Sequence, residues 1–105
     1  MVNKGYIYLI KLASSIENPL YKIGMTTDWG RRVDEFQNLY GDFEVVEVYK
    51  VAQMEHTETL IHEFFEEKRN RKTYHRELFY LNAEDISTFK KVLKMLINFE
   101  RRLGY

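Results

Sequence analysis

The sequence predicts a small α/β (α+β) fold in which a mainly antiparallel, three-stranded central sheet is flanked by helices. Three short segments are rich in β-branched and aromatic residues and are bounded by polar or turn residues, which is typical of strands. The segments between and after them carry apolar residues at helical spacing. Because no repeat or linker interrupts the 105 residues, we expect a single domain over residues 1–105.

The first part of the chain predicts an antiparallel hairpin. Residues 5–12 and 20–25 both have the composition of strands, and the turn-forming residues 13–19 separate them. Alternation along the first strand puts Tyr6 and Tyr8 on the same face.

The next segment predicts a helix that begins after an Asp28 N-cap and ends at Gly41. Its apolar residues form one narrow stripe, made of Trp29, Val33, Phe36 and Tyr40. Arg32 lies about 60° from Trp29 at the shoulder of this stripe, whereas Arg31 points roughly to the opposite side. Arg32 is therefore held beside the core, where it either lays its methylenes on the apolar stripe or acts in a site.

The rest of the chain adds a strand, a helix, a short extended piece and a final helix. The expected ranges are 43–51 for the strand, about 52–68 for the helix and 77–81 for the extended piece. Asn82 is a suitable N-cap for an amphipathic helix that continues through Leu103.

Two polar residues of the second helix lie at the edge of its apolar stripe. Glu58 is only about 20° beyond Phe65, and His62 follows one turn later. A carboxylate beside apolar side chains is costly unless it is paired or bound to a cation. An ion pair for Glu58 and a hydrogen-bonded structural role for His62 are the alternatives to a functional site.

The net charge of zero argues against a nucleic-acid binder that relies on overall positive charge. The charges are nevertheless segregated, giving +3 over residues 1–33, −9 over 34–67 and +6 over 68–105. The chain has no cysteine, no secretory leader and no long apolar run. These features predict an intracellular, cytoplasmic protein that does not contact a membrane.

Several short motifs, in order and with matching spacing, resemble the GIY-YIG nuclease superfamily. They are Tyr6-Ile7-Tyr8, Tyr21-Lys22-Ile23-Gly24, the residues Thr26, Asp28 and Arg32, and then Glu58. The chain is most similar to the phage and viral branch, whose second motif reads Tyr-Lys-Ile-Gly and whose later motifs are matched by Glu58, His62, Phe65, Glu77 and Phe79. Tyr6 stands where the superfamily has its first glycine, and Lys22 where it has its second tyrosine.

This resemblance implies a metal-dependent endonuclease that hydrolyses phosphodiester bonds, with DNA rather than RNA as the expected substrate. Tyr8 matches the general base, Arg32 the arginine that stabilises the phosphoryl group, and Glu58 the ligand of one Mg²⁺ or Mn²⁺ ion. Lys22, Tyr21 and His62 complete the candidate catalytic set. A lysine ammonium near a phenol favours the phenolate, so we expect Lys22 to lower the pKa of Tyr8. A phage or viral protein of this kind would act inside the host cell.

The basic segment after the second helix supplies the expected contacts to nucleic acid. Its candidate residues are Lys68, Arg69, Arg71, Lys72, Tyr74, His75 and Arg76. A solvated surface loop explains the same composition equally well. Two other functions also remain open, a catalytically inactive nucleic-acid-binding module and a small interaction subunit of a larger assembly. The sequence predicts no oligomeric state.

Overall fold

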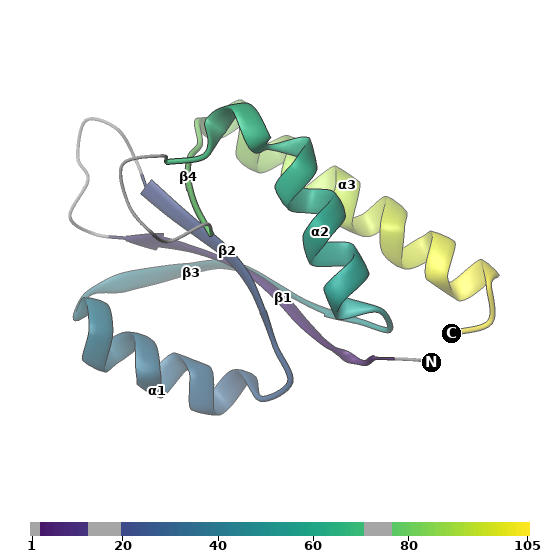
Figure 1. The fold of residues 1–105 in the computed structure, drawn as a ribbon, viewed down its shortest axis with the longest axis horizontal. Coiled ribbons are helices and arrows are strands. Elements are labelled where there is room, and N and C mark those ends of the chain that lie inside the picture. The colour runs from purple at the N-terminus through teal and green to yellow at the C-terminus, as the bar shows by residue number, and fades with distance from the viewer. Residues whose placement is uncertain (1–2, 13–19, 71–76) are drawn as a thin grey trace.

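A computed structural model describes residues 3–12, 20–70 and 77–105, and its elements follow the predicted order. The strands are β1 (Gly5–Leu12), β2 (Leu20–Thr26), β3 (Phe43–Val51) and β4 (Leu78–Tyr80), and the helices are α1 (Trp29–Tyr40), α2 (Met54–Phe64) and α3 (Ala83–Arg102). Every strand pairing is antiparallel, and the strand order is β3-β1-β2-β4 (Figure 1). The α+β class with a mainly antiparallel sheet is confirmed.

Two details differ from the sequence prediction. The sheet has four strands rather than three, because Leu78–Tyr80 pairs with residues 20–22 of β2. Three residues are too few to show alternation, so the sequence indicated an extended piece without placing it in the sheet. The second helix ends at Phe64 instead of continuing to residue 68, and a 3-10 turn, η1 (Glu66–Lys68), follows. This tighter turn redirects the chain so that Arg69 forms a bridge with Phe79.

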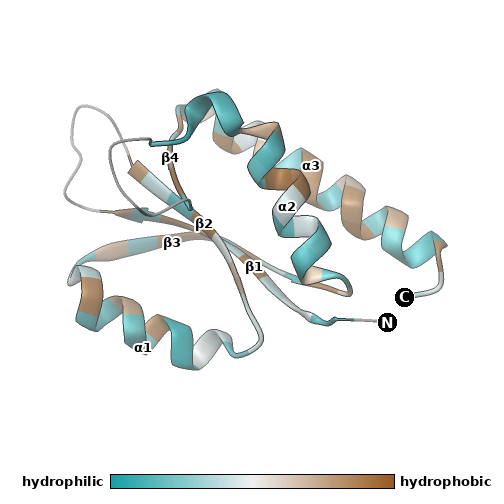
Figure 2. Ribbon diagram, viewed as in Figure 1, coloured by the Kyte–Doolittle hydropathy of each residue, from teal (hydrophilic) through white to brown (hydrophobic). Residues whose placement is uncertain are grey.

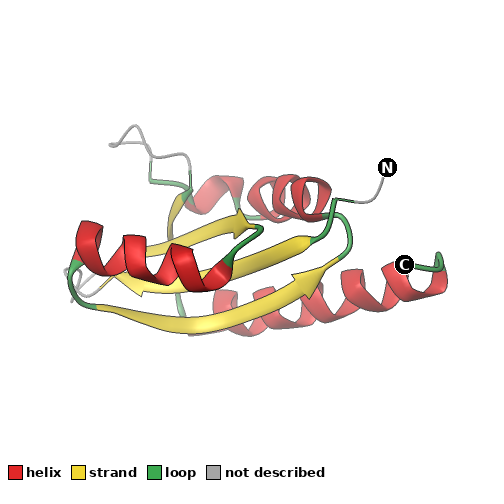
Figure 3. Cartoon of the chain, turned by 90° about the horizontal axis from the view of Figure 1, so that it is seen from below, coloured by secondary structure: helices red, strands yellow, loops and turns green. Residues whose placement is uncertain are grey.

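The helices cover the two faces of the sheet unequally. α1 lies on one face, which we call the α1 side, while α2 and α3 lie on the other, the α2–α3 side (Figures 1 and 3). The buried core of the α1 side consists of Tyr8, Ile10, Leu12, Phe36 and Leu78. The larger core of the α2–α3 side consists of Ile7, Leu9, Tyr21, Ile23, Val51, Met54, Ile61, Phe65, Phe79, Leu81, Phe89 and Leu93. Alternation along β1 therefore supplies both cores.

Local hydrogen bonds fix where the helices begin and end. The Asp28 side chain accepts from the backbone N–H of Arg31 at 3.1 Å, as the predicted N-cap requires, and Gly41 ends α1 with a φ of 70°. Asn82 and Asp85 form a reciprocal capping box at the start of α3. In the part of the chain that the structure describes, no helix is long and apolar enough to cross a membrane.

Candidate active site

The candidate site is centred on the cross-strand pair Tyr8 and Gly24. Tyr8 is completely buried, and its ring lies 5.4 Å from that of Trp29 and 5.2 Å from that of Phe36, measured between centroids. A Cβ atom on Gly24 would overlap the Tyr8 hydroxyl and would lie 3.0 Å from Oε2 of Glu77. Glycine is therefore required at this position, since any side chain would displace the phenol.

The edge of β2 next to Gly24 is tied to α2 by polar groups. β4 pairs only with residues 20–22, so the outward-facing backbone groups of Ile23 and Met25 need other partners. The Ile23 N–H donates to the Glu77 carbonyl at 2.9 Å, and Nε2 of His62 donates to the Ile23 carbonyl at 2.9 Å. These bonds hold α2 and the residue before β4 against the edge of β2, and the charge of Glu77 acts on Glu58.

Glu58 has a buried carboxylate oxygen that no described residue satisfies. Burial raises its pKa to about 7, the nearby charge of Glu77 adds to this shift, and Lys22 and a hydrogen bond from the Met25 backbone oppose it. Its Oε2 atom is buried and has no hydrogen-bond partner among the described residues. A buried carboxylate oxygen without a partner is costly, so this atom is suited to a cation or a proton.

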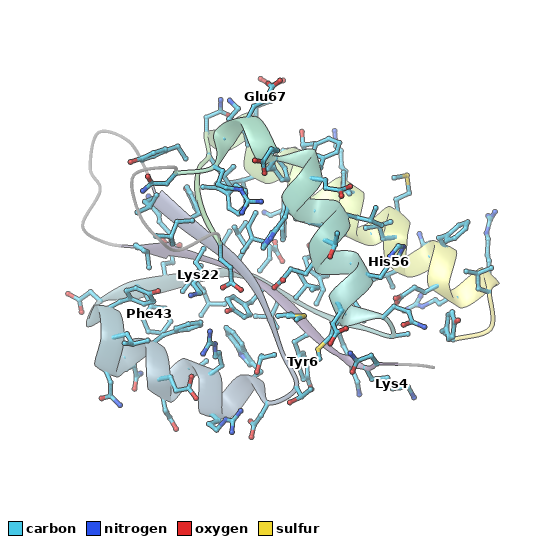
Figure 4. All side chains as sticks on the ribbon, in the orientation of Figure 1. Lys4, Tyr6, Lys22, Phe43, His56 and Glu67 are labelled. Carbon is cyan, nitrogen blue, oxygen red and sulfur yellow. The ribbon has the colours of Figure 1, made fainter. Side chains whose placement is uncertain are left out.

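Lys22 is held on the α1 side by a carboxylate and two aromatic rings. Its side chain is buried, and its Nζ atom lies 3.3 Å from Oε2 of Glu77 and donates to the Tyr40 hydroxyl at 3.3 Å. The ammonium also lies 5.6 Å from the ring centroid of Phe36. Figure 4 shows Lys22 in the interior of the fold, near α1. Its charge is thus balanced mainly by Glu77.

Arg32 reaches the Tyr8 hydroxyl from the first turn of α1. Its Nε donates to the phenol oxygen at 3.5 Å, and its Nη1 donates to Glu35 at 2.6 Å. The guanidinium also lies 5.0 Å from the centroid of the Phe36 ring. This placement confirms that Arg32 is held beside the core while Arg31 is exposed. Because a guanidinium has five N–H donors, Arg32 retains donors for an anion such as a phosphate.

The phenol of Tyr8 does not have the lowered pKa that the sequence suggested. Burial raises the pKa of Tyr8 well above its usual value of 10, and the hydrogen bond from Arg32 only partly opposes this. The expectation that Lys22 lowers this pKa is wrong for the free protein, because the ammonium of Lys22 is engaged by Glu77 and Tyr40.

Other predicted residues lie away from Tyr8 or outside the description. Tyr21 is buried in the core of the α2–α3 side, on the opposite face of β2 from Lys22. Lys68 pairs with Asp85 at 3.5 Å, and Arg69 pairs with Glu66 at 2.8 Å. The remaining candidates of the basic segment, Arg71, Lys72, Tyr74, His75 and Arg76, lie outside the described residues.

Glu77 is a site residue to which the sequence assigned no role. It was part of a motif with Phe79, and this motif was the only signal that could have indicated it. The ion pair between Glu77 and Lys22 joins residues 55 positions apart, so helical or strand periodicity could not predict it. Glu35, the partner of Arg32, was also missed, although a spacing of three residues on a helix brings such pairs together.

Comparisons with known proteins identify a domain family. A search of curated protein sequences found no significant match, and a search of solved structures found none. The T5orf172 domain matches residues 5–95, which include every element from β1 to most of α3. This domain is associated with nuclease-like proteins related to the GIY-YIG group. Because the match covers most of its length, the chain belongs to the T5orf172 domain family.

Proposed function

We propose that this protein is a metal-dependent endonuclease that cleaves phosphodiester bonds in nucleic acid, with DNA as the preferred substrate. The observation that carries this proposal is the buried, unpartnered Oε2 atom of Glu58 beside the cluster of Tyr8, Lys22 and Arg32. Membership in a family associated with nuclease-like proteins is compatible with it. The preference for DNA and the intracellular location stay predictions.

The residues at the site fit one hard divalent cation. No group of three or more His, Cys, Asp or Glu side chains gathers within the described residues, so a site made entirely of protein ligands is not available there. Mg²⁺ commonly binds through one or two carboxylates together with water and substrate phosphate. Glu58 would hold the ion through its Oε2 atom. When bound, Mg²⁺ or Mn²⁺ would polarise a phosphate oxygen and lower the pKa of its water.

The chain's own residues divide the remaining tasks. Arg32 donates hydrogen bonds to the non-bridging phosphate oxygens, which stabilises the charge of the transition state. Tyr8 would accept the proton of the attacking water only as its phenolate, a form that burial disfavours and the hydrogen bond from Arg32 favours. Lys22 supplies a second positive charge, and His62 positions the edge of β2 through the Ile23 carbonyl.

A nucleic-acid-binding module without turnover is the second candidate, and a specific observation favours it. Burial keeps the pKa of Tyr8 above its usual value, so the phenol remains protonated at neutral pH in the free protein. In this case Arg32 and Lys22 would bind phosphate, and no bond would be broken.

The test combines cleavage with metal binding in two matched variants. Labelled single-stranded and double-stranded DNA are incubated with Mg²⁺, Mn²⁺ or EDTA and with wild type, Glu58→Gln or Glu67→Gln. Glu67 lies in the turn η1 after α2 and is exposed, which makes it the control. We expect Glu58→Gln to abolish cleavage and the rise in melting temperature that Mn²⁺ causes in the wild type. Cleavage by Glu58→Gln at the wild-type rate contradicts the proposal, and DNA binding without cleavage by the wild type favours the second candidate.

A further inference from the structure

A hollow of about 270 Å³ opens at the edge of the sheet, between the end of β3 and the last turns of α3. Three cations from distant parts of the chain line it, namely Lys4, Lys50 and Arg101. All three are exposed, and none forms an ion pair with another residue that the structure describes. Figure 2 shows the hydrophilic last turn of α3, which carries Arg101. Because like charges around one hollow repel one another, an anion between them is stabilising.

The hollow also contains the carboxylate of Glu100, whose oxygen atoms already have partners. Its Oε1 atom accepts from the backbone N–H of Ala52, and its Oε2 atom accepts from that of Gln53, both at 3.0 Å. These bonds hold the end of α3 against the turn between β3 and α2. Since neither oxygen pairs with Lys4, Lys50 or Arg101, the hollow keeps an excess of positive charge.

The register of the sheet places this hollow beside the candidate active site. Lys50 pairs with Tyr6 on β1, and Tyr6 precedes Tyr8 by two residues, so their three side chains lie on the same face of the sheet. Lys50 is therefore the diagonal neighbour of Tyr8, with about 7–8 Å between their Cα atoms. Because β3 is an edge strand, the long side chain of Lys50 also reaches the hollow at this edge.

Tyr6 lies between the hollow and Tyr8, outside the core. The helix α1 begins at Trp29, which packs on Tyr8, and the core of the α1 side contains Tyr8 but not Tyr6. The Tyr6 side chain is only half-buried, and Figure 4 shows Tyr6 and Lys4 at the end of the sheet where the N-terminus lies. An aromatic ring beside a positively charged surface is typical of sites that bind a nucleic-acid strand.

We propose that the hollow of Lys4, Lys50 and Arg101 binds a flanking phosphate of the nucleic-acid strand whose scissile phosphate lies at Tyr8 and Arg32. Between these two phosphates the strand crosses the end of the sheet over Tyr6. This inference rests on the proposed function for the class of ligand, a nucleic acid, and not for bond cleavage. A phosphate held away from the scissile bond positions the strand and adds affinity without acting on the transition state.

Another pair of exposed cations on α3 provides a matched control. Lys91 and Arg102 line a different hollow on the outer face of α3, and neither forms an ion pair with another described residue. Successive residues of a helix point about 100° apart, so Arg102 faces away from Arg101. The variants K50Q/R101Q and K91Q/R102Q each neutralise one lysine and one arginine, which makes their change in net charge equal.

The first measurement is the affinity of the full chain for a labelled single-stranded oligonucleotide in EDTA, by fluorescence anisotropy at several salt concentrations. We expect K50Q/R101Q to bind more weakly, and the slope of log K against log salt to be shallower by about 1. K91Q/R102Q should keep the slope of the wild type. Equal losses in the two variants would mean that only the overall charge matters, which overturns the proposal. Circular dichroism checks that both variants are folded.

The second measurement locates the contact with oligonucleotides in which one phosphate at a time is replaced by an uncharged methylphosphonate. The wild type should lose affinity at a flanking position to which K50Q/R101Q is indifferent. If every replacement weakens both proteins alike, the proposal is wrong even when the wild type cleaves DNA. A difference at one position supports it even when the wild type cleaves nothing and the nuclease assignment fails. Binding of inorganic phosphate without any such difference would make the hollow a site for free phosphate and would also overturn the proposal.

Discussion

Each side of the sheet has its own buried core, and the two cores differ in chemistry. The core of the α2–α3 side is aliphatic and aromatic, and its centre contains fully buried residues such as Ile61, Phe89 and Leu93. The α1 side instead packs the phenol of Tyr8 and the ammonium of Lys22 around Phe36. This difference indicates that one side supplies the stability that allows the other to hold polar groups in costly positions.

Gly24 is the point at which the two sides meet. Glu58 belongs to α2, yet the charges of Glu77 and Lys22 affect its pKa. Its carboxylate therefore interacts electrostatically with groups of the α1 side. The absence of a side chain at Gly24 leaves room for Glu77 and the Tyr8 hydroxyl at this edge. The candidate site therefore lies between the sides rather than within either of them.

The largest expected effect is a loss of stability when a side chain in the core of the α2–α3 side is truncated. A change on the α1 side should instead affect cleavage. Phe89→Ala should lower the free energy of unfolding by about 4 kcal/mol, because Phe89 is fully buried beside Tyr49 and Phe65. Tyr8→Phe keeps the ring that packs on Trp29 and Phe36, so it should cost less than about 1 kcal/mol but abolish cleavage. Urea unfolding and a cleavage assay on both variants check this. Equal losses of stability in the two variants would contradict the inference that the α2–α3 side supplies most of the stability.

The next effect concerns the pH dependence of stability caused by Glu58. Its pKa is about 7 in the folded protein against a usual 4.5, so the folded state binds more protons than the unfolded state between these values. Stability from this group is therefore highest below pH 4.5 and falls as the pH rises to 7. Glu58→Gln, which carries no charge, should be more stable than the wild type by about 2 kcal/mol at pH 8 and similar to it near pH 4.

Urea unfolding in EDTA at several pH values measures this difference, and Glu67→Gln is again the matched control. Glu67 is exposed, so its variant should follow the wild type at every pH. If the free energies of unfolding of wild type and Glu58→Gln change in parallel from pH 4 to pH 8, ionising Glu58 does not destabilise the folded protein and the prediction is wrong.

Most of the fold could be predicted because it depends on local patterns. Asp28 and Asn82 cap their helices as expected, and the range Gly5–Leu12 is a strand over its predicted length. The predictions failed where tertiary contacts decide the outcome. β4 is a strand because β2 offers it an edge, and α2 ends early because the chain must turn toward Phe79.

The site shows the same division between local and long-range information. Helical geometry correctly placed Arg32 beside the core and Glu58 at the edge of an apolar stripe. It could not predict that Glu77 binds Lys22, since this ion pair exists only once β4 has paired with β2. The expected effect of Lys22 on Tyr8 failed for this reason.

The smallest expected effect is a change in DNA affinity when Glu35, the partner of Arg32, is neutralised. It tests whether Glu35 competes with phosphate for Arg32 or only adds negative charge near the site. Glu35 occupies Nη1 of Arg32 at 2.6 Å, but the pair is partly exposed and so contributes only about 0.5 kcal/mol. Glu35→Gln should therefore raise DNA affinity about twofold, measured by fluorescence anisotropy in EDTA. Asp34→Asn removes the same charge from an exposed neighbouring residue. Because salt screens the general effect, only the gain in Glu35→Gln should persist at high salt. Equal gains in both variants would mean that Glu35 does not compete with phosphate for Arg32.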